Sequence, residues 1–342
     1  MYEKQLETTA AALVAKGKGI LAIDESSATC KKRFDSIGAE STVENRRAYR
    51  ELLITVPGGG QYVSGMILFD ETIRQATADG TPFPEALKRQ GILIGIKVDT
   101  GSKKLAGAPG EQVTEGLDGL RERFVEYRGL GASFAKWRAV INIGEGIPSQ
   151  YGLDANAHAL ARYSALCQET GLVPIVEPEV IMEGNHTIER CFEVTEATLH
   201  TVFNALYQQR VTLEHMTLKA SMVISGDRCP KQAGVEEVAR QTVRCLKRTV
   251  PAAVPGVVFL SGGQSALVAT AHLNLMNQLG PHPWPLSFSY GRALQEPALK
   301  TWRGQASNAA AAQKALYHRE KMNSAACFGR YTAQMEQEKA AA

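Results

Sequence analysis

The sequence lacks both the long apolar runs of a membrane protein and the paired cysteines of a disulfide-rich one. No uninterrupted apolar run approaches the ~20 residues that span a bilayer. Residues 1–18 mix Glu and Lys with alanines, which is typical of a surface helix and unlike a signal peptide. The six cysteines are far apart and form no C-x-x-C pair, so we expect reduced thiols and a cytoplasmic protein. A transit peptide already removed would make the plastid stroma the location instead.

The sequence also has little excess charge and no cofactor-binding motif. It has 38 basic and 35 acidic residues with no long basic run, which argues against nucleic acid or a membrane as partner. No G-x-G-x-x-G follows the first strand-like run, which disfavours a dinucleotide-binding fold. The seven histidines form no H-x-x-x-H pair or Cys/His cluster, so we predict no metal site.

What the chain does contain is a series of roughly eight apolar, strand-like runs, most of them followed by a helix-like stretch. Such strands are suited to burial on both faces, and a (β/α)₈ TIM barrel fits their number better than a doubly wound open sheet. We predict one barrel domain over residues 1–342, with an extra N-terminal helix and a helical C-terminal tail that is mobile over about 330–342. The predicted strands are 19–23, 62–69, 91–96, 132–140, 172–176, 217–224, 257–260 and 286–290.

One of these runs, residues 217–224, carries a lysine within it. A buried ammonium is costly unless it finds a partner or gives up its proton. Lys219 is therefore either an imine-forming nucleophile or a strand-end lysine whose head reaches water. Neighbouring Lys97 and Lys136 would favour the first alternative, since like charges depress the pKa of an amine.

Ionisable residues lie inside or at the ends of most predicted strands. In a barrel the carboxyl ends of the strands converge on the face where active sites are built. Each residue alone could be a solvated loop charge, but the whole set predicts an active site. Alternate residues of a strand point to the same face, so residues two apart in this set, such as Glu177 and Glu179 or Lys136 and Arg138, should project together. The set is Asp24, Lys97, Asp99, Lys136, Arg138, Glu177, Glu179, Lys219 and Arg292.

Two glycine-bearing turns after the last two strands suit anions. Ser261-Gly262-Gly263 opens a helix, so its backbone N–H groups can surround a phosphate. Ser289-Tyr290-Gly291-Arg292 adds a guanidinium that can bind phosphate through two hydrogen bonds. Because barrel enzymes often bind phosphate at these two loops, we predict a phosphate site there.

Several segments resemble the class I fructose-bisphosphate aldolases, and the similarity extends from about Glu7 to Gly329. The resemblance implies a (β/α)₈ barrel, a Schiff-base mechanism without metal or cofactor, and a homotetramer in the cytosol or plastid. The reaction would serve glycolysis, gluconeogenesis or the Calvin cycle. The resembling segments are 17–26, 95–99, 134–138, 174–179, 218–219, 259–265 and 288–295.

The resemblance also implies a role for each catalytic residue. Lys219 would attack the C2 ketone of fructose 1,6-bisphosphate, and Glu177 would move protons while the imine forms. Asp24 would take the C4 hydroxyl proton as the C3–C4 bond breaks. Lys136 and Glu179 would tune the local charge.

By the same resemblance, two groups of residues would hold the two phosphates of the substrate. The C1 phosphate group is Ser261, Gly262, Gly263, Ser289, Gly291 and Arg292. The C6 phosphate group is Arg33, Ser26, Ser27, Lys97 and Arg138.

The chain departs from the family at its end, which is Ala-rich where well-studied members carry a tyrosine that assists enamine protonation. Tyr331 lies nearby, but the sequence does not show that it substitutes. Two alternatives to the implied function stay open. One is another Schiff-base barrel enzyme, either a fructose 1-phosphate aldolase or a transaldolase-like enzyme, and the other is a non-catalytic phosphosugar-binding scaffold.

Overall fold

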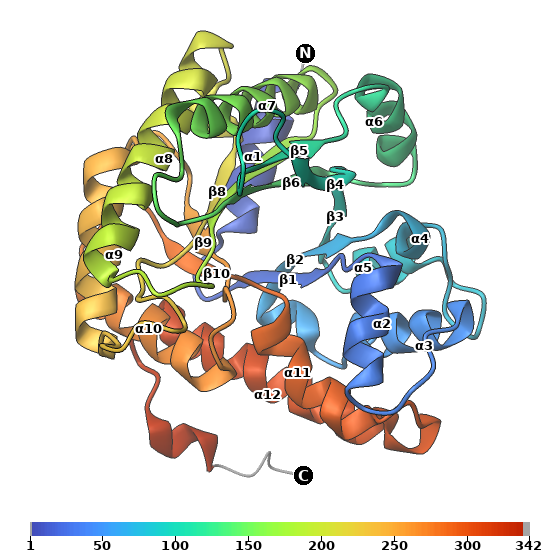
Figure 1. Ribbon diagram of the computed structural model, residues 1–342. Coiled ribbons are helices and arrows are strands. Elements are labelled where there is room, and N and C mark those ends of the chain that lie inside the picture. The colour runs from blue at the N-terminus through green and yellow to red at the C-terminus, as the bar shows by residue number, and fades with distance from the viewer. Residues whose placement is uncertain (1, 338–342) are drawn as a thin grey trace.

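The computed structural model describes residues 2–337, and its central feature is a closed barrel (Figure 1). Within these residues, parallel strands pair in the order β1-β10-β9-β8-β7-β6-β3-β2, and β2 pairs with β1 to close the ring. The predicted (β/α)₈ barrel is confirmed. The barrel strands are β1 (Gly19–Ile23), β2 (Val63–Leu68), β3 (Leu93–Lys97), β6 (Phe134–Ile141), β7 (Val173–Val180), β8 (Thr217–Ala220), β9 (Val257–Phe259) and β10 (Leu286–Tyr290).

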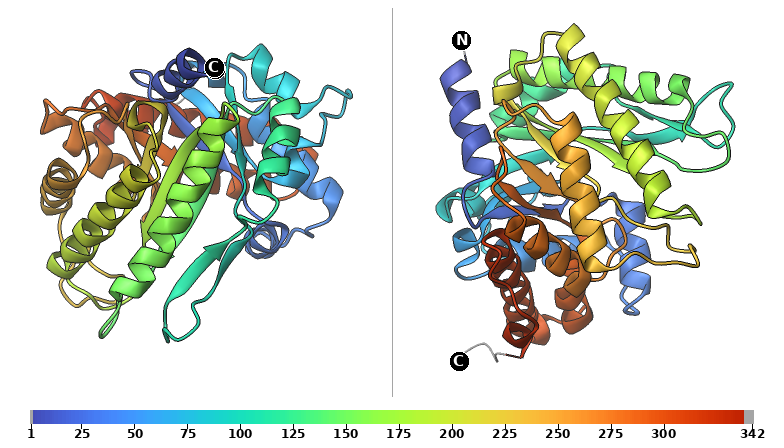
Figure 2. Two further views of the ribbon diagram at one scale, coloured as in Figure 1. Left: turned by 90° about the horizontal axis from the view of Figure 1, so that it is seen from above. Right: turned by 90° about the vertical axis from the view of Figure 1, so that its left-hand side faces the viewer.

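Helices surround the barrel on its outside (Figures 1 and 2). Several begin where the sequence supplies a capping side chain, as at Ser149 and Thr187, whose hydroxyls accept from a backbone N–H three residues on. None of the helices between residues 2 and 337 is long and apolar enough to cross a membrane. They are α1 (Glu3–Leu13), α2 (Ser27–Asp35), α3 (Val43–Ile54), α4 (Asp70–Ile73), α5 (Phe83–Arg89), α6 (Leu120–Gly129), α7 (Gln150–Glu169), α8 (Ile188–Gln208), α9 (Val235–Thr249), α10 (Ala266–Gln278), α11 (Arg292–Trp302) and α12 (Ala309–Cys327), with short 3-10 turns η1 (Gly59–Gln61), η2 (Leu213–His215), η3 (Ala306–Asn308) and η4 (Ala333–Glu336).

The apolar core forms two separate clusters. The larger one lies between the strands and the surrounding helices. The smaller one fills the barrel interior, where Leu6, Ala10 and Leu13 of α1 pack with strand residues such as Phe134 and Val173. Helix α1 therefore closes one end of the barrel with apolar side chains and leaves the other end for polar groups.

The inward-facing side chains change from apolar to charged along several strands. On β1, Ile20 and Ala22 belong to the interior cluster, and Asp24 comes two residues later. On β7, Val173 and Ile175 precede Glu177 in the same way. Because strand residues alternate between two faces, these side chains all point into the barrel. The barrel thus has an apolar floor with charged groups above it.

Many predicted strand limits differ from the observed ones by one or two residues, and two strand ends differ by four. β7 extends to Val180, so Glu177 and Glu179 lie within the strand and not after it. Pro178 is tolerated there because β7 pairs with β8 only up to Val176, which leaves one edge free of ladder hydrogen bonds. β8 ends at Ala220, since the Ser221 hydroxyl takes over the contact with β7 by bonding the backbone of Val180.

A hairpin of β4 (Gly101–Lys104) and β5 (Gln112–Glu115) was not predicted. It projects from the barrel beside α7 (Figure 2), and the Asn156 side chain on α7 donates to the Gln112 carbonyl at 2.8 Å. Its strands are short and polar, so they lack the apolar alternation that identifies a strand in sequence.

The predicted mobile tail is only partly described. Glu336 accepts hydrogen bonds from Arg319 at 2.6 Å, from His318 at 2.9 Å and from the Tyr331 hydroxyl at 2.9 Å. These contacts tie η4 to α12. Residues 338–342 lie outside the described residues, so the mobility of the tail stays a prediction.

Packing inside the barrel predicts a large effect at Gly95. A Cβ at this position would lie 2.1 Å from the Phe134 ring, which is fully buried in the interior cluster. Overpacking of this kind typically costs about 1–3 kcal/mol. We expect Gly95→Ala to lower the free energy of unfolding by that amount in a urea titration.

The matched control is Gly129→Ala at the end of α6, where an added Cβ would meet nothing within 4 Å. This variant should be neutral or slightly stabilising, because alanine favours a helix over glycine. Equal stability of the two variants would contradict this description of the barrel interior.

Candidate active site

A cavity of about 800 Å³ occupies the barrel end opposite α1. Two predicted residues lie outside its lining: Ser27, the exposed first residue of α2, and Asp99, which pairs with Lys97. The predicted residues that line the cavity are Asp24, Ser26, Arg33, Lys97, Lys136, Arg138, Glu177, Glu179, Lys219, Ser261, Gly262, Gly263, Ser289, Gly291 and Arg292.

Four of these side chains form a continuous row of alternating charge. Lys219 Nζ lies 2.9 Å from Glu177 Oε1, and Glu177 Oε2 lies 3.3 Å from Lys136 Nζ. Lys136 Nζ lies 2.7 Å from Asp24 Oδ2. The four groups come from β8, β7, β6 and the end of β1, and at least 87% of each side chain is buried, since the most exposed of them, Asp24, is 13% accessible. We call these four residues the charged row.

Electrostatics in the charged row favour the ionised forms of its carboxylates. Burial works to raise the pKa of Asp24, but the charges of Lys136, Lys219 and Lys97 outweigh it and hold the pKa well below its ordinary value. The pKa of Glu177 is lowered in the same way, against the effect of burial, by Lys136 and Lys219. For Lys136, burial works to lower the pKa, and Asp24 and Glu177 raise it instead.

Further ion pairs hold the cationic groups of the cavity wall. Arg138 Nε pairs with Glu179, the next acidic residue along β7. Lys97 Nζ on β3 lies 3.7 Å from Asp99 Oδ1. The cavity therefore offers several cations whose positions are fixed before a ligand enters.

The turn after β9 has the geometry of an anion site. Gly262 and Gly263 have φ values of 42° and 83°, which favour glycine and turn successive N–H groups in one direction. A Cβ at Gly263 would lie 3.3 Å from Arg292 Nη2, so the guanidinium lies directly beside this turn. The buried Ser289 hydroxyl has no hydrogen-bond partner among the described residues. Together these donors can hold a phosphate.

Sequence reasoning missed several residues that line the same cavity. Thr29 and Lys32 on α2, and Ser36 directly after it, line the cavity together with Arg33. Their spacing of three, four and seven residues is that of one helix face, and this signal could have identified them. The loop after β7 adds Ile181 and Glu183, and the remaining lining residues are Ala22, Glu25 and Leu260.

Tyr331 contacts the tail and α10. Its hydroxyl donates to Glu336 and its backbone N–H donates to Asn274 Oδ1 at 2.8 Å. Burial, together with the Glu336 carboxylate, raises the pKa of Tyr331 to about 12. Tyr331 is not one of the described residues that line the cavity, so these contacts do not indicate that it replaces the family's terminal tyrosine.

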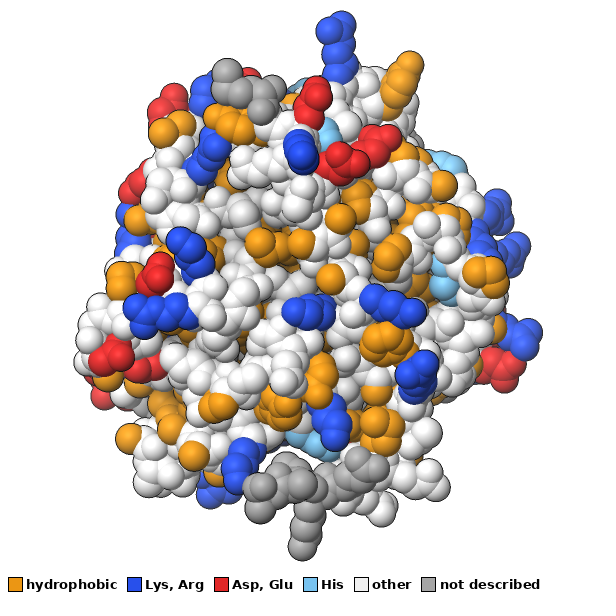
Figure 3. All heavy atoms as spheres, turned by 180° about the vertical axis from the view of Figure 1, so that it is seen from behind, with side chains coloured by type: hydrophobic (Ala, Val, Ile, Leu, Met, Phe, Trp, Pro, Cys, Tyr) orange, Lys and Arg blue, Asp and Glu red, His pale blue; other side chains and the backbone are white. Residues whose placement is uncertain are grey.

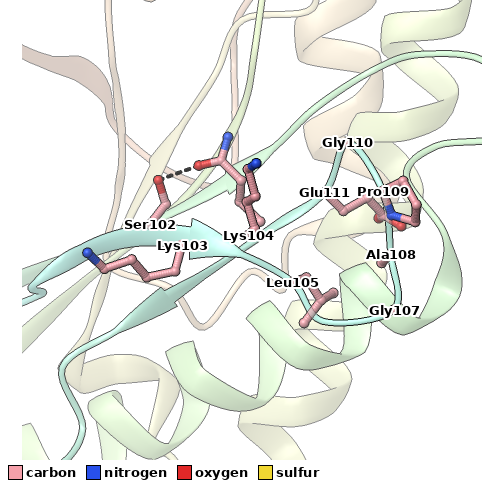
Figure 4. A pocket seen from close by; sticks show the side chains of 10 residues that line it. Ser102, Lys103, Lys104, Leu105, Gly107, Ala108, Pro109, Gly110 and Glu111 are labelled. Carbon is pink, nitrogen blue, oxygen red and sulfur yellow. Dashed lines mark hydrogen bonds between the residues drawn. The ribbon is translucent and has the colours of Figure 1, made fainter.

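Two other surfaces differ from this cavity. The β4–β5 hairpin encloses a hollow of about 810 Å³ (Figure 4), but Glu111 there already accepts from the Ser149 backbone and hydroxyl, and Ser102 donates to Gln112. On the face shown in Figure 3, basic side chains are spread among apolar and uncharged ones. Among residues 2–337, no three His, Cys, Asp or Glu side chains gather so that they could hold a metal ion.

The low pKa of Asp24 predicts a pH-dependent contribution to stability. Asp24→Asn should lower the free energy of unfolding at pH 7 by about 3 kcal/mol, because it leaves Lys136 without its nearest charge partner. A carboxylate with a lowered pKa stabilises the fold above its unfolded pKa of about 3.9 and loses that effect as the pH falls through the folded value. The difference between native protein and variant should therefore be constant from pH 7 to about 5 and shrink below about 3.9.

Urea titrations at pH 7, 5 and 3.5 measure this difference, with the exposed Asp118→Asn as control. A difference in unfolding free energy that grows toward acid pH would contradict the lowered pKa of Asp24.

Comparison with known proteins agrees with this geometry. The family model described as fructose-bisphosphate aldolase class-I matches residues 5–342. A probable fructose-bisphosphate aldolase class 1 of Xanthomonas campestris pv. campestris is 64% identical over 332 residues, 97% of this chain and 99% of the relative. A fructose-bisphosphate aldolase of Chlamydomonas reinhardtii, named chloroplastic, is 53% identical and covers 99% and 90% of the two chains.

Solved structures extend the agreement to the fold. A co-crystal structure of fructose-bisphosphate aldolase from Plasmodium falciparum superposes with a TM-score of 0.95 at 49% identity, covering 96% of each chain. The resemblance found in the sequence and the assignment to a lyase are confirmed. The chain belongs to the class I fructose-bisphosphate aldolase family.

Proposed function

We propose that the protein catalyses reversible aldol cleavage of fructose 1,6-bisphosphate to dihydroxyacetone phosphate and glyceraldehyde 3-phosphate through a Schiff base on Lys219. The observation that carries this proposal is the buried Lys219–Glu177 contact of 2.9 Å inside a cavity lined by cationic groups. A nucleophilic amine needs a nearby group that can take up and return protons, and Glu177 is such a group.

The first half of the reaction forms the imine. Lys219 first transfers a proton from its ammonium to Glu177, and the resulting free amine attacks the C2 ketone to give a carbinolamine. Glu177 delivers a proton to the C2 hydroxyl, which leaves as water while the nitrogen lone pair forms the protonated C=N bond. Lys136, 3.3 Å from Glu177, balances the carboxylate charge that remains.

The second half breaks the C3–C4 bond. Asp24 accepts the C4 hydroxyl proton, the C3–C4 electron pair moves toward the iminium nitrogen, and glyceraldehyde 3-phosphate is released. The enamine is then protonated at C3, and water hydrolyses the imine to dihydroxyacetone phosphate and free Lys219. Because the pKa of Asp24 is lowered, its carboxylate is ionised and ready to accept that proton.

Two groups of residues bind the phosphates in this proposal. The turn of Ser261, Gly262 and Gly263 with Ser289, Gly291 and Arg292 holds the C1 phosphate, and the unpartnered Ser289 hydroxyl beside Arg292 supports this assignment. Arg33, Ser26, Lys97 and Arg138 hold the C6 phosphate, whereas Ser27, which lies outside the cavity lining, is not part of this group. Glu179 keeps Arg138 in place.

We also propose that the protein is a cytoplasmic homotetramer, or a stromal one where a transit peptide precedes it. Membership of the class I fructose-bisphosphate aldolase family supports the tetramer, because the resemblance to that family implies one. The chloroplastic Chlamydomonas relative supports the stromal alternative.

Borohydride reduction tests the proposed intermediate. Treatment of the protein with borohydride and fructose 1,6-bisphosphate together should abolish activity irreversibly, because reduction converts the imine into a stable secondary amine. Mass spectrometry of the digested protein should place the adduct on the peptide that contains Lys219.

Lys219→Arg is the control and should yield no adduct. EDTA should leave the amount of adduct formed by the native protein unchanged. Comparing the turnover of fructose 1,6-bisphosphate with that of fructose 1-phosphate distinguishes a bisphosphate enzyme from a monophosphate one. Only the bisphosphate can contact both sets of phosphate-binding residues. An adduct on a different lysine, or cleavage without any trapped adduct, would refute the proposal.

A further inference from the structure

Glu25 lies between two guanidinium groups that have very different surroundings. Its Oε1 is 2.5 Å from Arg33 Nη1, and its Oε2 is 2.7 Å from Arg50 Nη1. Arg33 lines the cavity and its side chain is 25% exposed. The side chain of Arg50 on α3 is only 3% exposed. The Glu25 carboxylate thus contacts both Arg33, which a ligand can reach, and Arg50, which it cannot.

The position of Glu25 is fixed by further hydrogen bonds. The Gln295 amide on α11 donates to Glu25 Oε1 at 2.8 Å and to the Ala22 carbonyl at 2.5 Å. The Tyr49 hydroxyl donates to Gln295 Oε1 at 3.2 Å. Arg50 Nη2 also donates to the Glu25 carbonyl at 3.1 Å. The carboxylate therefore has a single orientation, set by α3 and α11.

Counting charges shows what Arg50 contributes. Arg33, Glu25 and Arg50 together carry one net positive charge, since burial raises the pKa of Glu25 less than the two arginines lower it. Because Arg50 is buried and cannot reach a ligand, its charge balances Glu25. The charge of Arg33 is then available to an anion.

Arg33 also lies where an anion is expected. Its Nη2 is 3.9 Å from the position that a Cβ on Gly291 would occupy, so this member of the C6 phosphate group also lies close to the residues proposed to hold the C1 phosphate. Without Arg50, the Arg33 guanidinium would mainly neutralise Glu25 and attract a phosphate much less.

We propose that Arg50 is a positioning residue, which balances the charge of Glu25 and so leaves the Arg33 guanidinium free to bind a phosphate group of the substrate. The identity of that substrate rests on the function proposed above. The effect on phosphate binding does not depend on the cleavage reaction.

Calorimetric titration with inorganic phosphate tests this role. Arg50→Met retains the length and much of the volume of the side chain but removes its charge, and we expect the Kd for phosphate to rise about tenfold, equivalent to about 1.4 kcal/mol. Arg33→Met should cause a loss of the same size. In steady-state kinetics, Arg50→Met should raise KM for fructose 1,6-bisphosphate with little change in kcat.

Arg47→Met is the matched control. Arg47 lies on the same helix but pairs with Glu44 and Glu51, so its replacement should leave the Kd for phosphate unchanged.

The double variant Glu25→Gln/Arg50→Met separates charge balance from structural support. It removes one negative and one positive charge and leaves Arg33 as the only cation of the three. We expect its Kd for phosphate to return to within about threefold of the native value. It also leaves no unpaired buried charge, so it keeps the test available if Arg50→Met does not fold.

The proposal is overturned if Arg50→Met binds phosphate as tightly as native protein, or if the double variant binds no better than Arg50→Met. It is also overturned if Arg33→Met leaves the Kd unchanged. A native protein that fails to cleave fructose 1,6-bisphosphate while these phosphate affinities change as expected would contradict only the proposed function.

Discussion

The contact between Lys219 and Glu177 is the interaction on which the rest of the site depends. Burying an ammonium and a carboxylate removes both from water, and their mutual attraction offsets this cost only when neighbouring groups complete the arrangement. Here Lys136 and Asp24 extend the contact into the charged row, where each group has a neighbour of opposite sign. The loss of Glu177 would leave Lys219 without its partner in the row, and the loss of Lys136 would do the same to Asp24.

The barrel makes this arrangement possible because it brings strand ends from distant parts of the sequence to one place. Helix α1 fills the opposite end with apolar side chains, which gives the charged groups a dry floor. The two-residue period of each strand then determines which side chains rise above that floor. The same sequence pattern that buries Ile20 and Val173 in the interior thus directs Asp24 and Glu177 into the cavity.

The sequence predicted the barrel because apolar strands recur at regular intervals. The limits of β1 and β10 agree with their predicted runs, since both are apolar segments with clear polar ends. The predicted end of β7 was wrong because Pro178 and the two acidic residues beside it are typical of a loop. They can continue the strand because β8 does not pair with β7 beyond Val176. The polar β4–β5 hairpin carries no apolar signal at all.

The residues of the candidate site could be predicted from the sequence, but their contacts could not. The chemical type and strand position of each charged residue indicated that they would gather, and the cavity contains nearly all of them. Which lysine contacts which carboxylate could not be predicted, because pairing depends on barrel register and side-chain direction. The Glu25–Arg50 contact is of this kind, since it joins the end of β1 to the buried face of α3.

A crystal structure of the protein reduced with borohydride in the presence of fructose 1,6-bisphosphate tests the central claim most directly. We predict continuous electron density from Lys219 Nζ to C2 of the sugar, with the carboxylate of Glu177 beside the new bond and one phosphate at the Gly262–Gly263 turn. An unmodified Lys219, with the sugar bound elsewhere or attached to another side chain, would contradict the account.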